Sequence, residues 1–143
     1  MWCATNALNG LIGAGVPQDW TTHMIGHELT AQFGIDHAKT LAILQPAVWQ
    51  VCKEQKRGKL RQYAERIWHL TEGDDDERID KAIEQTRAFF EALGVSTRLS
   101  AYGVTPDKID AVVLALEAHG MTALGEKREV NLEVSRRILM AAL

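Results

Sequence analysis

The chain has 143 residues, of which 46% are hydrophobic and 24% charged, and its formal net charge is −3. This length fits one domain with a buried core. The slight negative charge argues against nucleic acid or a membrane surface as partner, because both usually require a basic face. No apolar run reaches the roughly 20 residues of a membrane span, and the first residues lack the basic start of a signal peptide. We therefore expect a cytoplasmic protein in which Cys3 and Cys52 are free thiols.

The first half of the chain is expected to form four helices. The first covers residues 2–11 and ends in the flexible segment GLIGAGVP, and the second covers residues 19–33. A third helix is expected over residues 36–53, with Asp36 as its cap. Pro46 lies inside this apolar run and should kink or break the helix. An amphipathic helix follows over residues 57–70.

The second half is expected to add three more helices. The acidic run Asp74–Glu77 should open one of them, because negative charge suits the positive end of the helix dipole, and Gly94 should end it. Another is expected over residues 105–120, with proline at its first position, and Asn131 should cap the last. No segment alternates apolar and polar residues as a strand does. The fold class predicted is therefore all-α, a compact irregular bundle of about six to eight helices.

Three histidines lie in the short segment HMIGHELTAQFGIDH. His23 and His27 are four residues apart, so they share a face of the predicted helix. Gly34 offers a helix end, and the next helix would fold His37 back towards this pair. Neutral imidazoles that converge in this way are common ligands of transition metals. The alternative is that His23 and His27 are polar residues on a helix face, bonded to backbone or water.

Other candidate residues carry weaker signals. Asp19 lies one turn before His23 and could be a further ligand, but a role at the positive end of the helix dipole is favoured. His69 is expected at the surface, and His119 is expected as a cation near a helix C-terminus. The glycine-rich segment 10–15 follows a predicted helix and not a strand, which argues against a nucleotide-binding loop.

Longer segments resemble a known family. They are ALNGLIGAGVPQDWTTHMIGHELTAQFGIDHAKTLAILQPAVW, AERIWHLTEGDDDERIDKAIEQTRAFFEALG, HGMTALGE and SRRI. The chain resembles the C-terminal, all-helical domain of iron-containing alcohol dehydrogenases, in the branch of butanol dehydrogenases and NADPH-dependent aldehyde reductases. The resemblance covers essentially residues 1–143, and it implies a dehydroquinate synthase-like C-terminal α domain.

The resemblance implies specific roles for the three histidines. In the family four side chains hold one divalent metal, Fe²⁺ or Zn²⁺, and two of them match His23 and His37. The intermediate histidine matches His27, which the resemblance implies to be a proton-carrying, catalytic group beside the metal. The other two ligands are an Asp and a His upstream of this region. NADP(H) or NAD(H) is bound mainly by an N-terminal nucleotide-binding domain that is absent from these residues.

The activity implied is reversible hydride transfer between the nicotinamide cofactor and a small aldehyde or alcohol. Because half of the metal ligands and the cofactor domain are absent, we expect a fragment that is inactive alone. An exposed apolar face favours a homo-oligomer. Two alternatives stay open: a non-catalytic helical interaction or metal-binding module, and dehydroquinate synthase or glycerol dehydrogenase chemistry on the same fold.

Overall fold

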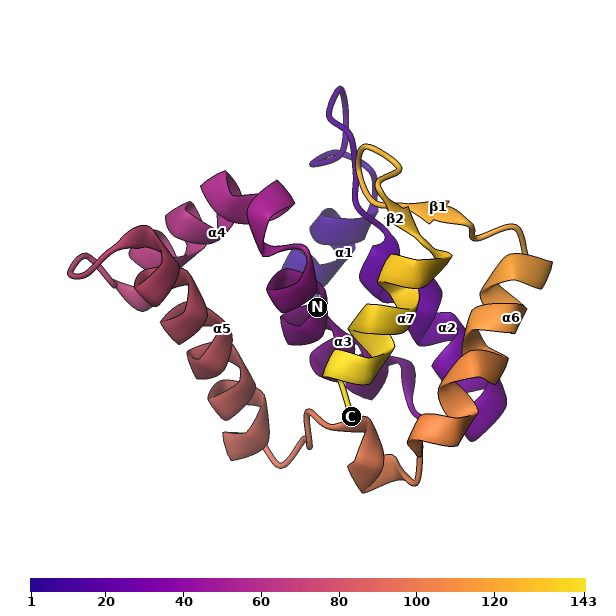
Figure 1. Cartoon of the computed structure of the whole chain (residues 1–143). Coiled ribbons are helices and arrows are strands. Elements are labelled where there is room, and N and C mark those ends of the chain that lie inside the picture. Colours follow the sequence, from indigo (N-terminus) through magenta and orange to yellow (C-terminus); the bar gives the residue numbers. More distant parts are fainter.

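The computed structural model describes all 143 residues and confirms the all-α class (Figure 1). Two short 3₁₀ helices precede α6, and no helix combines the length and hydropathy that a membrane span requires. A two-stranded antiparallel sheet joins α6 to α7, with Ala123 opposite Asn131 and Leu124 opposite Val130. The α-helices are α1 (Trp2–Leu8), α2 (Thr21–Phe33), α3 (His37–Val51), α4 (Lys53–Trp68), α5 (Asp75–Ala92), α6 (Ile109–Ala118) and α7 (Leu132–Ala141), and the strands are β1 (Ala123–Leu124) and β2 (Val130–Asn131).

Two hydrophobic clusters hold these helices together. In Figure 1, α3 lies between the pair α4 and α5 on one side and α2, α6 and α7 on the other, in agreement with the packing of α3 against α2, α5 and α7. A small cluster of Leu60, Ile79 and Ile83 joins α4 to α5 and contacts Trp49 of α3. The other cluster is larger and contains most of the fully buried aliphatic side chains. Each such side chain contributes about 1.5–3 kcal/mol to the free energy of unfolding, so this larger cluster is the main source of stability. Its largest members are Ile25, Leu29, Ile43, Leu44, Leu99, Ile109, Leu116, Ile138 and Leu139.

The helix boundaries differ from the sequence expectation at α3 and α4. Of the two outcomes expected at Pro46, the break does not occur, because α3 runs as one helix from His37 to Val51. Pro46 is buried together with Leu44 and Ala47, so core packing offsets the backbone hydrogen bond that proline cannot donate. The chain turns instead at Cys52, and α4 starts at Lys53, four residues earlier than expected.

The acidic run does open α5, as predicted. Asp74 accepts a hydrogen bond from the Glu77 amide at 2.9 Å, and Glu77 accepts one from the Asp74 amide at 3.4 Å, which is a capping box. The following carboxylates face cations of α4. Arg57 Nη1 lies 2.6 Å from Asp76 Oδ1, so charge complementarity adds to the apolar contact between α4 and α5.

The N-terminal segment is the least buried part of the chain. Helix α1 ends three residues earlier than expected and contains no buried residue. Large apolar side chains such as Trp2, Leu8 and Leu11 are more than two-thirds exposed. These exposed apolar side chains could form the contact surface of the expected homo-oligomer, which stays a prediction.

Candidate metal centre

The hairpin of α2 and α3 brings the three histidines together. Gly26 permits the close approach of the two helices, because a Cβ atom there would lie only 2.8 Å from Thr40 Oγ1. Gly34 ends α2 in the left-handed conformation, with φ of 66°. Asp36 occupies the N-cap position of α3 as predicted, but its side chain makes no capping hydrogen bond and pairs with Lys39 Nζ at 2.6 Å.

The three imidazole rings converge, as their spacing predicted. The ring centroids of His27 and His37 are 4.7 Å apart and the rings are stacked, with 6° between their planes. The His23 centroid lies 5.2 Å from that of His37 and 6.4 Å from that of His27. His23 and His37 are half-buried, whereas His27 is exposed. We call these three residues the histidine cluster.

The cluster has the properties of an incomplete metal site. Burial, and then the charges that His37 and His27 would carry, lower the pKa of His23 and favour its neutral, ligating form. His37 Nδ1 is buried and has no hydrogen-bond partner. Yet no group of three or more His, Cys, Asp or Glu side chains in the chain is arranged to hold a metal ion by itself. The residues present therefore fit part of a coordination shell.

Trp20 packs against the histidine cluster, a contact that no local sequence pattern indicates. Its indole packs edge-on against the imidazole of His23, with ring centroids 5.2 Å apart. The indole Nε1 donates to Gln18 Oε1 at 3.3 Å, and the Trp20 residue is 37% exposed. The ring therefore restricts the orientation of His23 while one part of it still faces solvent.

Asp19 acts at the start of α2 and not as a member of the histidine cluster. One carboxylate oxygen accepts a hydrogen bond from the Thr21 amide at 2.8 Å, and the other pairs with Lys56 of α4. Both oxygens thus have partners, which agrees with the favoured interpretation of Asp19. The link to Lys56, 37 residues away, was not predictable from local sequence.

The Asp19–Lys56 pair should make folding stability depend on pH. Burial alone would raise the pKa of Asp19, but hydrogen bonds from Lys56 and Thr21 and the charge of Lys56 lower it below its usual value. Because the folded-state pKa is lower than the unfolded one, this stability is present above about pH 4 and is lost as pH falls through the folded-state pKa. In urea titrations from about pH 5 to pH 2, Asp19→Asn is expected to lose less stability than the parent chain. An unchanged pH slope would contradict this account.

The other two histidines do not join the histidine cluster. His69 is exposed, as expected, and ends α4 in the left-handed conformation with φ of 55°. His119 follows the last residue of α6, as expected, but it also has a specific partner: its Nδ1 lies 2.6 Å from Oε1 of the buried Glu28. Glu28 is adjacent to His27 in α2, so this contact fixes α6 against the helix that carries the histidine cluster.

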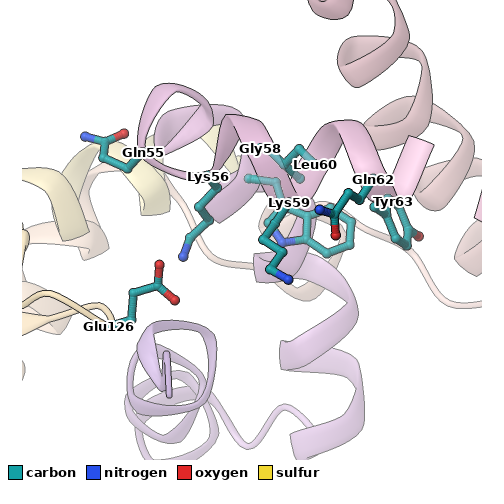
Figure 2. A pocket seen from close by; sticks show the side chains of 9 residues that line it. Gln55, Lys56, Gly58, Lys59, Leu60, Gln62, Tyr63 and Glu126 are labelled. Atoms are coloured by element: carbon teal, nitrogen blue, oxygen red, sulfur yellow. The ribbon is translucent and has the colours of Figure 1, made fainter. Parts of the chain in front are cut away.

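A cavity of about 540 Å³ lies along α4 and contains no histidine. Figure 2 shows Lys56 and Lys59 of α4 and Glu126 of the β1–β2 loop among the side chains that line it. Trp49 and Tyr63 form its aromatic wall, with ring centroids 4.9 Å apart. The cavity is therefore a feature separate from the candidate metal centre.

Comparison with known proteins supports the sequence interpretation. A model of the "Fe-containing alcohol dehydrogenase family, C-terminal" matches residues 3–143. The chain is 64% identical over 142 residues to the NADPH-dependent aldehyde reductase YqhD of Escherichia coli, a match that covers 99% of this chain and 37% of that protein. It is 30% identical over 135 residues to the NADH-dependent butanol dehydrogenase A of Clostridium acetobutylicum, covering 93% of this chain and 35% of that protein.

Solved structures give the same assignment. The crystal structure of E. coli YqhD superposes with a TM-score of 0.97 at 64% identity, over 100% of this chain and 37% of that one. The NADH-dependent butanol dehydrogenase A of Thermotoga maritima superposes with a TM-score of 0.87 at 30% identity. This match covers 99% of this chain and 37% of that one. The chain thus spans little more than a third of the length of these relatives. It belongs to the iron-containing alcohol dehydrogenase family and corresponds to part of the family's C-terminal region.

Proposed function

We propose that this chain supplies the histidine half of the metal centre in an NAD(P)H-dependent alcohol dehydrogenase or aldehyde reductase. The observation that carries the proposal is the convergence of the histidine cluster in a chain whose family is named for iron. His23 and His37 are the proposed ligands of a divalent metal, either iron or zinc. The remaining ligands are proposed to lie outside these 143 residues, because no group of three or more donor side chains is arranged to hold a metal here. The nicotinamide site is proposed to lie outside them as well, because the chain spans only 37% of the length of E. coli YqhD.

The physical properties of the two proposed ligands support this assignment. A neutral imidazole is required for coordination, and the environment of His23 lowers its pKa in that direction. The unpartnered Nδ1 of the half-buried His37 is a polar atom whose surroundings are incomplete in this chain. When bound, the metal supplies a Lewis acid that polarises the aldehyde oxygen. Trp20 contacts the His23 ring from one side and restricts its orientation.

His27 is proposed to carry the proton that the reaction requires. Reduction of an aldehyde adds a hydride to carbon and a proton to oxygen, so a proton donor must lie beside the oxygen. His27 is the exposed member of the histidine cluster, which lets it exchange protons with solvent. Its ring stacks on that of His37, and this contact sets its orientation.

A chimera tests the proposal. In it, the matching 37% of E. coli YqhD is replaced by this chain, which the 64% identity and close superposition permit. We expect the metal-loaded chimera to oxidise NADPH with butyraldehyde. The 143-residue chain alone is expected to show no turnover, because two imidazoles make a weak metal site and no cofactor site accompanies them. An inactive but folded, metal-loaded chimera would favour the non-catalytic alternative, and clear turnover by the chain alone would refute the expected inactivity.

A further inference from the structure

Arg87 of α5 is a buried cation with too few partners. The residue is 4% exposed, and its only side-chain hydrogen bond runs from Nη1 to the Thr97 carbonyl oxygen at 3.3 Å. Its Nη2 is buried and donates to no atom. Burial, followed by repulsion from Arg98, lowers the pKa of the Arg87 guanidinium. Because a guanidinium stays charged in proteins, such a group requires a counterion or further acceptors.

A cavity of about 320 Å³ lies beside this guanidinium. Three elements contribute to its lining: Gln50 near the C-terminal end of α3, Arg87 with neighbouring residues of α5, and Arg98 from the segment that follows α5. Arg98 Nη1 donates to the Ala141 carbonyl oxygen at 3.1 Å, which ties its side chain to the C-terminal end of α7. Two guanidinium groups from separate elements thus line one cavity.

The carboxylates around the cavity accept no hydrogen bond from either arginine. Asp80 is part of the lining, but its Oδ1 is 2.8 Å from Lys53 Nζ and is already paired. Glu84 also lines the cavity, and its charge and that of Glu91 act to raise the pKa of Arg87, but Glu84 is exposed and accepts no hydrogen bond from either arginine. Glu91 accepts the hydroxyl hydrogen bond of Thr97 at 2.6 Å. The cavity therefore keeps guanidinium donors without acceptors, above all Nη2 of Arg87.

We propose that this cavity binds a small oxyanion of the phosphate class, with Arg87 and Arg98 as its donors. Tetrahedral oxyanions present several acceptor oxygens, and guanidinium groups bind them through paired hydrogen bonds. Gln50 offers a neutral amide donor at the same cavity. The bound group is either free phosphate or the phosphoryl group of a larger molecule. This site involves none of the histidines and stands independently of the proposed dehydrogenase function.

Thermal unfolding of the 143-residue chain tests the site. Inorganic phosphate is compared with sodium chloride at equal ionic strength, and ribose 5-phosphate serves as the monoester probe. At about ten times its Kd, a ligand specific for the folded state should raise Tm by roughly 4 °C. Arg98→Gln should abolish the rise. Arg136→Gln should keep it, because Arg136 pairs with Asp110 on another surface.

Each outcome bears on the proposal. A rise with inorganic phosphate that is lost only in Arg98→Gln supports a free oxyanion as ligand, and a rise with ribose 5-phosphate alone supports a phosphoryl group on a larger molecule. Phosphate also stabilises proteins generally through exclusion from their surface, and that effect would survive in Arg98→Gln. A rise of the same size in the parent chain and in Arg98→Gln, or no rise with either probe, would overturn the proposal. Calorimetric titration at constant ionic strength gives a second readout that does not depend on the stability of the variants.

Discussion

Replacing His23 or His37 by alanine in the chimera is expected to remove most of the bound metal and nearly all NADPH-dependent aldehyde reduction. Each change deletes one proposed ligand. Loss of Lewis-acid activation costs several kcal/mol of transition-state stabilisation, which corresponds to a fall in kcat/KM of roughly 10³-fold or more. Metal content by mass spectrometry and turnover with butyraldehyde are measured on the same preparations.

A matched control keeps this experiment specific. His69→Asn also removes an imidazole, but from the exposed C-terminal end of α4, and asparagine tolerates the left-handed backbone at that position. This variant should retain both metal and activity. Circular dichroism of all variants checks that the helices are intact. Full metal content and turnover in His23→Ala would refute the ligand assignment.

Replacing His27 by alanine is expected to separate chemistry from metal binding. The variant should keep its metal, because His27 is not a proposed ligand, while kcat falls about 10²- to 10⁴-fold through loss of the proton carrier. The exposed position of His27 makes a large effect on folding unexpected.

The pH profile provides the specific readout for His27. Loss of a proton carrier should change the shape of the profile of kcat against pH in His27→Ala, whereas a purely structural effect would lower kcat equally at every pH. Metal loss in His27→Ala comparable to that in His23→Ala would show that His27 is a ligand and would contradict its proposed role. An unchanged kcat with an unchanged pH profile would contradict it equally.

The helical fold was largely predictable from sequence because its signals are local. The structure contains the helices that were predicted from apolar periodicity, from the acidic run at the start of α5 and from Asn131 before α7. Asn131 accepts a hydrogen bond from the Val134 amide at 2.9 Å, as an N-cap residue should. The break considered at Pro46 is absent because the effect of proline on α3 depends on burial, which only the tertiary structure determines. Strands β1 and β2 have two residues each, too few to produce an alternating pattern.

The candidate site was predictable only in part, for a similar reason. The three residues of the histidine cluster lie within one helical hairpin, so the convergence of their rings could be predicted from local geometry. The contact between Glu28 and His119 joins residues 91 positions apart, and no local pattern indicates it. Arg87 lies in a charged helix and shows no sign in the sequence of its deep burial. The features of the site that could not be predicted therefore depend mostly on contacts between residues far apart in the sequence.

The most direct test of the metal centre is the anomalous diffraction of zinc-loaded crystals of the chimera. The account predicts one strong peak, with imidazole nitrogens of both His23 and His37 about 2.0–2.1 Å from it and His27 outside bonding distance. A peak bound by His27 in place of either residue, or a metal bound at full occupancy away from His23 and His37, would contradict the account.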